Sequence, residues 1–224
     1  MIGRRRLAGH EVGRIRLRLA VNDLLRREWH DLLFAWAVDP CLADPTFEEI
    51  RKHYAGPGRF YHTLDHVQDV LQTVDSLGSY ARNLSAVKLT GWLHDVIYDS
   101  RASDNEERSA DYAERLCDRL SIPQGRLVAS LILKTKTHDA GADADAQVLI
   151  DADLAILGAS EPAYRTYAQK IRQEYDWVPE PDYRSGRRRI LERFLTGPGI
   201  YHFLSHLEDP ARRNIAAEIA RLAI

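Results

Sequence analysis

Three segments of this chain place metal-binding residue types where a helical protein would otherwise be apolar. The first carries His62 and His66, whose spacing of four puts two side chains on one face of a helix. The second is the dipeptide His94-Asp95, and the third carries Asp151 and Asp153; both lie in strongly apolar runs. Burying unpaired imidazole and carboxylate groups is expensive, and a shared cation would offset that cost. Polar residues that interrupt several apolar helices are typical of metal sites in helical bundles.

The spacing of His62 and His66 is weak evidence by itself, because His202 and His206 have the same spacing. The second pair follows the break Gly197-Pro198-Gly199 and has no acidic residue in the intervening turn. We therefore assign a structural or surface role to that pair.

Composition restricts both the ligand types and the class of protein. The chain has 224 residues, nine His, two Cys and a formal net charge of −2. Cys41 and Cys117 lie far apart, so any metal must be bound by imidazole and carboxylate, and we expect a reducing, cytoplasmic environment. The near-neutral charge argues against a nucleic-acid polymer as partner, and the absence of an 18-residue apolar run argues against a membrane span.

Residues 1–21 form a basic extension that contains six arginines and a single acidic residue, Glu11. No continuous apolar stretch follows the arginines, so the segment does not resemble a secretory signal. We interpret it as a frayed or poorly assigned start, with an amphipathic organelle-targeting segment as the alternative, ahead of a domain that covers residues 22–224.

The remainder of the chain follows a helical hydrophobic period almost throughout. A capping box at Thr46 predicts a short helix, and a second box at Ser103 precedes another. Further helices are predicted over residues 22–36, 61–77, 84–97, 123–137, 148–157, 160–175, 183–195 and 209–222, with a polar loop over 138–145. No alternating strand, internal repeat or long linker is evident. The sequence therefore predicts an all-α, single-domain helical bundle.

The order His, then His-Asp, then Asp resembles the HD superfamily of metal-dependent phosphohydrolases. The stretch from Tyr61 to Val70 is similar to the Tyr-His-x-x-x-His segment of the cyclic-nucleotide phosphodiesterases in that superfamily, although Thr63 stands where those enzymes have Asn. The chain resembles most closely the small bacterial proteins described as predicted metal-dependent HD-superfamily phosphohydrolases, from about residue 22 onward. The segments that carry this resemblance are Tyr61–His66, Asp104–Ser109, Thr135–His138 and Asp151–Leu154.

This resemblance implies a bundle of HD-domain type and a set of site residues. The metal ligands that it implies are His66, His94, Asp95 and Asp153. It implies that His62 lies beside the metal as a general acid, and we count Asp95 with His62 as catalytic. Asp151, about 200° from Asp153 on the same helix, is the alternative last ligand, and the Asp-Leu-Ala match favours Asp153.

A mixed nitrogen and oxygen ligand set suits Mn, Fe, Co, Ni or Zn and does not select among them. Such an ion would activate a water for attack on phosphorus, and His62 would protonate the leaving group. Lys136 and His138 are the candidate substrate-binding residues, and His138 could instead join a second metal with Asp95 bridging. The function expected is hydrolysis of a small phosphorylated molecule, with nucleotides among the candidates.

Three alternatives stay open at the level of the sequence. Some HD-superfamily members are di-iron oxygenases, and an extra ligand such as His138 would permit two ions. A non-catalytic ligand-binding or regulatory protein could retain the same site, and a bundle without metal would also fit the helical pattern. The sequence contains no Walker A loop, GxGxxG, HExxH or GxSxG motif, and it does not determine an oligomeric state.

Overall fold

The structure is a computed structural model that describes residues 21–223. Every regular element over these residues is a helix and none is a strand, which confirms the prediction of an all-α fold. The predicted basic extension lies outside the described residues, apart from Val21. Within the described part of the chain, no helix has both the length and the hydropathy that crossing a membrane requires.

Residues 21–34 are helical, and the chain then continues through nine α-helices and three short 3₁₀-helices over the described range. The α-helices are α2 (Pro40–Tyr54), α3 (Leu64–Ser76), α4 (Leu84–Leu93), α5 (Asn105–Leu120), α6 (Gly125–Thr135), α7 (Ala144–Leu154), α8 (Glu161–Glu174), α9 (Glu180–Thr196) and α10 (Glu208–Leu222). The 3₁₀-helices are η1 (Gly78–Tyr80), η2 (Ala155–Gly158) and η3 (Ser205–Leu207). The chain divides into two units between Glu49 and Ile50, inside α2.

In the first unit, α2 begins earlier than the sequence predicts. Pro40 starts the helix, as proline often does, and the Asp39 side chain accepts a hydrogen bond from the Cys41 N–H at 2.9 Å. The predicted capping box at Thr46 is wrong, because Thr46 lies inside α2. Its hydroxyl donates to the Leu42 carbonyl at 2.7 Å and accepts from the Trp29 indole at 3.0 Å.

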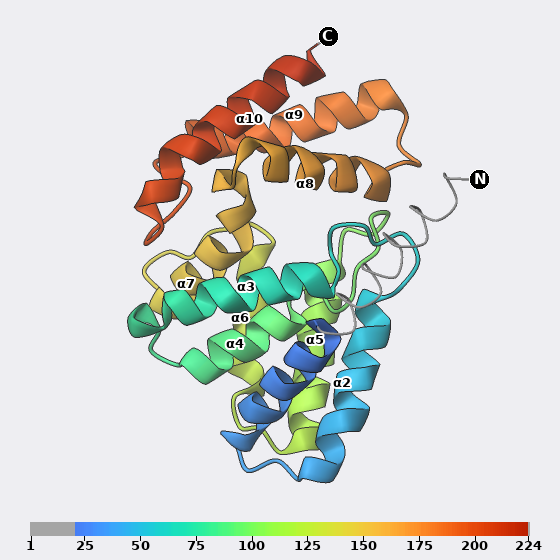
Figure 1. The fold of residues 1–224 in the computed structure, drawn as a ribbon, viewed down its shortest axis with the longest axis vertical. Coiled ribbons are helices and arrows are strands. Elements are labelled where there is room, and N and C mark those ends of the chain that lie inside the picture. The colour runs from blue at the N-terminus through green and yellow to red at the C-terminus, as the bar shows by residue number, and fades with distance from the viewer. Residues whose placement is uncertain (1–20, 224) are drawn as a thin grey trace, which may run out of the picture. The chain divides into compact units, whose positions relative to one another are not determined.

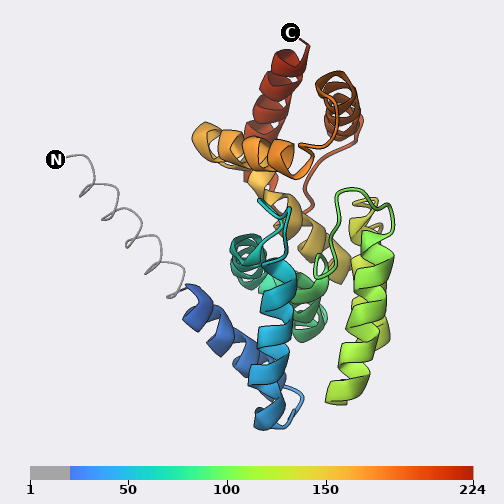
Figure 2. The ribbon, with the colours of Figure 1, turned by 90° about the vertical axis from the view of Figure 1, so that its right-hand side faces the viewer.

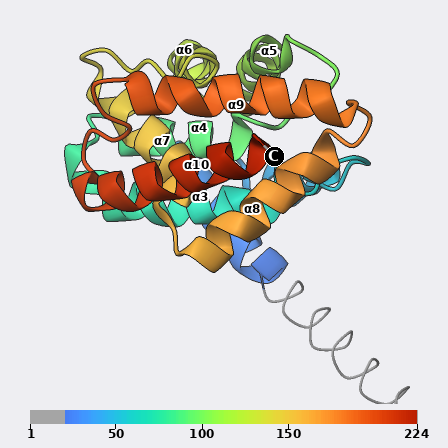
Figure 3. The ribbon, with the colours of Figure 1, turned by 90° about the horizontal axis from the view of Figure 1, so that it is seen from above.

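In the second unit, helices α3 to α7 form a bundle, and α8, α9 and α10 lie together across one end of it (Figures 1 and 3). Helices α5 and α6 run side by side (Figure 2). A shared hydrophobic core joins α3, α4 and α7 to the three C-terminal helices. Leu149, Tyr164, Leu191 and Ile215 are among its fully or nearly fully buried members.

Helix α3 begins at Leu64, three residues after the predicted start. The backbone N–H groups of residues 60–62 are hydrogen-bonded to the Glu174 side chain, which holds this stretch as a turn. His62 therefore precedes the helix, and the prediction that His62 and His66 share a helical face is wrong.

Helix α4 ends at Leu93, four residues before the predicted end at Ile97. His94 is its C-cap residue, and the next backbone carbonyls accept hydrogen bonds from the Arg59 side chain. The His94-Asp95 dipeptide thus lies where α4 stops, rather than inside a helix.

Two other helix starts also differ from the predictions. Asp104 is the N-cap of α5 but makes no side-chain capping hydrogen bond, so the predicted capping box there is wrong. Helix α7 starts at Ala144, four residues earlier than predicted, because the Asp143 carboxylate accepts the N–H groups of Asp145 and Ala146.

Two glycines provide a test of packing in the C-terminal layer. A Cβ on Gly158 would lie 2.6 Å from the Leu207 Cβ and 2.9 Å from its carbonyl oxygen, whereas one on Gly186, in α9, would meet nothing within 4 Å. We expect Gly158→Ala to lower the free energy of unfolding by about 1–3 kcal/mol and Gly186→Ala to raise it by up to about 1 kcal/mol. Urea unfolding of both variants measures this, and equal effects would contradict the close approach at Gly158.

Candidate metal centre

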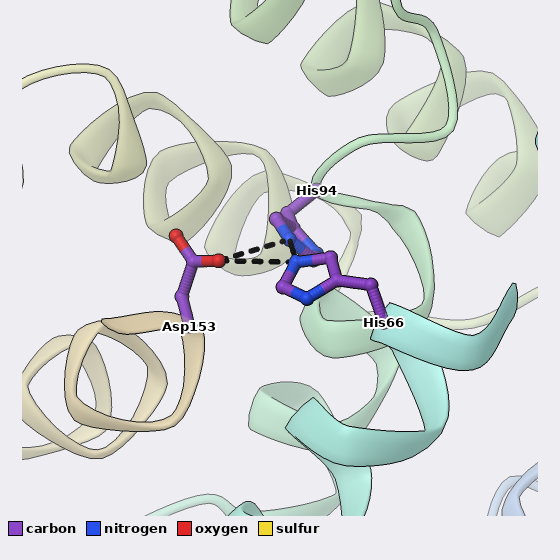
Figure 4. Close-up of side chains that lie close together, drawn as sticks. All are labelled: His66, His94 and Asp153. Carbon is purple, nitrogen blue, oxygen red and sulfur yellow. Dashed lines mark hydrogen bonds and ion pairs between the residues drawn. The ribbon is translucent and has the colours of Figure 1, made fainter. Parts of the chain in front are cut away.

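Three side chains from separate helices meet at one point in the second unit (Figure 4). His66 comes from α3, His94 from the end of α4 and Asp153 from α7. The His66 Nε2 and the His94 Nε2 are 3.2 Å apart. The Asp153 Oδ1 lies 3.1 Å from the His66 Nε2 and 3.6 Å from the His94 Nε2. Both imidazoles are almost completely buried.

Asp95 and His138 lie against this cluster on two sides. The Asp95 Oδ2 is 3.2 Å from the His94 Nε2 and 3.7 Å from the His66 Nε2. The His138 Nε2 is 3.5 Å from the second carboxylate oxygen of Asp153. His138 follows α6 with a left-handed backbone (φ 54°), a conformation that is uncommon outside glycine and often found at functional positions.

The donor types and their spacing fit a divalent transition metal. His66, His94 and Asp153 offer ligand atoms that all lie within 4.8 Å of one another. Ligands bound about 2.0–2.2 Å from one ion are separated by roughly 3.0–3.5 Å in octahedral or tetrahedral geometry. The His94 Nδ1 faces the Gly91 carbonyl at 3.1 Å and would donate to it, which leaves the Nε2 lone pair directed into the cluster.

The charges in the cluster depend on one another. Burial would raise the pKa of Asp153 and lower that of His94, but the contacts between carboxylate and imidazole reverse both directions. The pKa of Asp153 therefore lies well below its usual value, and the pKa of His94 lies well above. The two carboxylates therefore favour positive charge at this point of the structure, which a bound cation would supply.

His62 lies beside the cluster, with its Nε2 3.9 Å from the Asp95 Oδ2. Its Nδ1 is 2.6 Å from the Glu174 Oε2, so the carboxylate fixes the ring orientation. The Tyr98 ring stacks on the imidazole at 4.2 Å, and the Tyr98 hydroxyl donates to the same Glu174 oxygen at 2.9 Å. Burial opposes charging of His62, but Asp95 and Glu174 outweigh it, and the pKa of His62 is raised.

Glu174, the last residue of α8, contacts the candidate site and was not predicted from the sequence. Its Oε1 accepts hydrogen bonds from the backbone N–H groups of Phe60, Tyr61 and His62 at 2.7–3.0 Å. Burial opposes ionisation, but these bonds and the His62 imidazole outweigh it and lower the pKa of Glu174 to about 2. A glutamate at the end of an amphipathic helix carries no sequence signal for such a role.

Arg59 connects the two segments that carry His62 and Asp95. Its guanidinium donates to the backbone carbonyls of His62 at 3.0 Å, Asp95 at 2.8 Å and Val96 at 2.9 Å. The group also lies over the rings of Tyr54 and Tyr98. Arg59 therefore sets the separation between the His62 imidazole and the Asp95 carboxylate, and no sequence pattern indicated this role.

Lys136, which the sequence predicted to bind substrate, is engaged elsewhere. Its ammonium group contacts the Glu107 carboxylate, lies 2.8 Å from the Ser103 carbonyl and 3.9 Å from the Glu106 carboxylate. These residues lie at the start of α5 or just before it, and Lys136 makes no contact with the described cluster residues. Its observed role is to join the end of α6 to α5.

Asp151, the alternative last ligand, faces away from the cluster into the loop that follows α9. Its fully buried carboxylate accepts the backbone N–H groups of His202, Phe203 and Leu204 at 2.6–3.1 Å. The His202 Nδ1 lies 3.3 Å from the same carboxylate. The structure thus places Asp153, and not Asp151, beside the two buried histidines, while His202 supports a loop.

Comparison of the chain with family models, with curated proteins and with solved structures finds no match in any of the three. The HD-superfamily relationship therefore stays a prediction that rests on the sequence motifs.

Substitutions of Asp151 and Asp153 should have different effects on the stabilisation of the protein by metal. A metal ion at 100 times its dissociation constant stabilises a protein by about 2.7 kcal/mol. We expect Asp153→Asn to lose this response to Mn, Co or Zn. Asp151→Asn should keep it while losing about 1–3 kcal/mol of stability without metal, because its loop contacts weaken. Thermal unfolding with and without metal measures both, and an undiminished response of Asp153→Asn would contradict the centre.

The Glu174 contacts predict a pH dependence of stability. The folded-state pKa of about 2 lies below the ordinary value of 4.5, so the contribution is present above pH 4.5 and is lost as pH falls toward 2. We expect Glu174→Gln to lower the free energy of unfolding by about 2–3 kcal/mol at pH 7, and by progressively less as the pH falls from 5 to 3. Glu161→Gln, an exposed change in the same helix, should cost at most about 0.5 kcal/mol at any of these pH values. A pH-independent difference between wild type and Glu174→Gln in urea unfolding would refute the assignment.

Proposed function

We propose that this chain is a metal-dependent phosphohydrolase of the HD type that acts on a small phosphorylated molecule, with nucleotides among the candidates. The observation that carries the proposal is the placement of an oriented, cation-forming imidazole, His62, beside a cluster of two histidines and two aspartates. An acid next to a mixed nitrogen and oxygen centre suits hydrolysis of a phosphate ester.

The residues that would hold the metal are His66, His94, Asp95 and Asp153. When bound, the ion supplies a water of lowered pKa and positive charge for the transition state. Glu174 accepts a hydrogen bond from the His62 Nδ1–H, which directs the Nε2–H toward the cluster, where its proton can pass to the leaving oxygen. Because the pKa of His62 is raised, a larger share of this residue carries that proton near neutral pH.

A second candidate, an HD-type di-iron oxygenase, is favoured by one specific contact. His138 faces the Asp153 Oδ2, while His66 and His94 face the Oδ1, so the two oxygens of one carboxylate point to different imidazoles. Such a carboxylate is suited to bridge two ions. Two irons per chain in the purified protein, without phosphatase activity, would favour this candidate over the first.

Hydrolysis can be tested with phosphomonoesters, nucleotides and cyclic nucleotides in the presence of Mn, Co or Ni. We expect turnover that chelation abolishes and that His94→Ala removes. His62→Asn should lower kcat by roughly 10²- to 10⁴-fold while the metal content stays unchanged, because only proton transfer is lost. Turnover no higher than that of His94→Ala would refute the proposed activity, and an unaffected kcat in His62→Asn would refute the role of the acid.

A further inference from the structure

The imidazole of His62 has one hydrogen bond in its plane and one parallel ring against its face. In its plane, the Nδ1 lies 2.6 Å from the Glu174 Oε2. Against its face, the Tyr98 ring stacks with 4.2 Å between ring centres and an interplanar angle of 28°. The rings of Tyr61 and His66 also contact the imidazole, but they are nearly perpendicular to it, at 80° and 83°. Tyr98 is therefore the neighbour whose ring plane matches that of the imidazole.

A single hydrogen bond does not fix an imidazole, because the ring can still rotate about the axis from its Nδ1 to the acceptor oxygen. A stacked ring opposes this rotation, since tilting the imidazole would break the favourable contact between the two faces. The rotation matters because the His62 Nε2 lies 3.9 Å from the Asp95 Oδ2, on the side of the cluster. A displacement of roughly 1 Å at a reacting group can lower a rate by about 10²-fold.

The position of Tyr98 is fixed by the same groups that hold the turn before α3. Its hydroxyl donates to the Glu174 Oε2 at 2.9 Å, the oxygen that also faces the His62 Nδ1. The Arg59 guanidinium lies over the Tyr98 ring, 5.4 Å from its centre. Burial and the Glu174 carboxylate raise the pKa of Tyr98, so the hydroxyl keeps its proton and remains a donor. Because that proton is directed to Glu174, Tyr98 is not itself a proton donor to the substrate.

We propose that Tyr98 is a positioning residue for hydrolysis, whose ring fixes the rotation of the His62 imidazole about its hydrogen bond to Glu174. The stacked ring thereby keeps the Nε2 directed toward the cluster. The role of His62 as the acid rests on the proposed function, whereas the hold of Tyr98 on the imidazole does not. Loss of the Tyr98 ring should slow proton transfer without weakening the binding of substrate or metal.

The kinetic test compares Tyr98→Leu, which removes the ring, with Tyr98→Phe, which removes only the hydroxyl. With metal, we expect Tyr98→Leu to lower kcat about 10²-fold and Tyr98→Phe to lower it less than about tenfold, with KM and metal content within about twofold of wild type. The matched control is Tyr164→Phe, because the Tyr164 hydroxyl also donates to a buried carboxylate, that of Glu218, at 2.6 Å. This control should keep kcat within about twofold of wild type.

The same change in a chain without the acid distinguishes positioning from a general loss of structure. If Tyr98 acts through His62, Tyr98→Leu should lower kcat by no more than about twofold in the His62→Asn chain, because the group that it positions is already absent. A further loss of about 10²-fold in that chain would overturn the inference.

A measurement without turnover separates this inference from the proposed function. In the metal-free full chain with ¹⁵N-labelled histidine, the proton on the His62 Nδ1 should give an NMR signal that is missing in His62→Asn. We expect Tyr98→Phe and Tyr164→Phe to keep this signal and Tyr98→Leu to lose it, because a ring that rotates freely exposes its proton to exchange with water. If Tyr98→Leu does not fold, Tyr98→Met replaces it, since methionine fills space without a planar ring.

The NMR outcomes decide the inference whatever the activity of the chain. A signal that is absent from wild type, or unchanged in a folded Tyr98 variant without the ring, would overturn the inference and leave the proposed function standing if wild type hydrolyses its substrate. No hydrolysis by wild type, with a His62 signal that depends on the Tyr98 ring, would overturn the proposed function and support the hold of Tyr98 on His62.

Discussion

The site depends on one buried carboxylate, that of Glu174. It accepts three consecutive backbone N–H groups from a turn that lies 112–114 residues earlier in the chain, and its second oxygen binds the His62 imidazole. This one carboxylate thereby holds residues 60–62 outside α3, orients the imidazole and connects the end of α8 to the turn that precedes the cluster of His66, His94 and Asp153. Charge-assisted hydrogen bonds in a dry environment are strong enough to impose such a local departure from helix.

A positively charged side chain, that of Arg59, binds the backbone carbonyl groups of the same turn. The Arg59 guanidinium donates hydrogen bonds to the backbone carbonyl groups of residues 62, 95 and 96. The Glu174 carboxylate thus binds backbone N–H groups of the segment that carries His62, and Arg59 binds backbone carbonyl groups of the segments that carry His62 and Asp95. The backbone just before α3 and just after α4 is therefore bonded to side chains where a longer helix would use its own hydrogen bonds. Side chains of opposite charge thus bind the irregular backbone on both segments beside the cluster, which restricts the positions of His62 and Asp95.

Much of the cluster could be predicted from the sequence. The segments that carry His66, His94 and the pair Asp151 and Asp153 stand out because polar residues interrupt apolar runs, where burial without a partner would be costly. The choice of His66, His94 and Asp153 among these residues came from the resemblance to the HD superfamily. The helical hydrophobic period also predicted the all-α fold, since it depends only on neighbours along the chain. Glu174 and Arg59 could not be predicted in this way, because each is an ordinary residue of an amphipathic or polar segment whose partners are distant in sequence.

The sequence by itself therefore determined the helical class, the two histidines of the cluster and the pair of aspartates from which its third member comes, because periodicity and residue type are local properties. Tertiary structure alone decided between Asp151 and Asp153, which lie on one helix but face a loop and the histidines respectively. It also decided that Lys136 pairs with α5 and that His62 precedes α3. The physical reason is that a charged side chain takes its role from the groups that neutralise it, and packing brings those groups from remote parts of the chain.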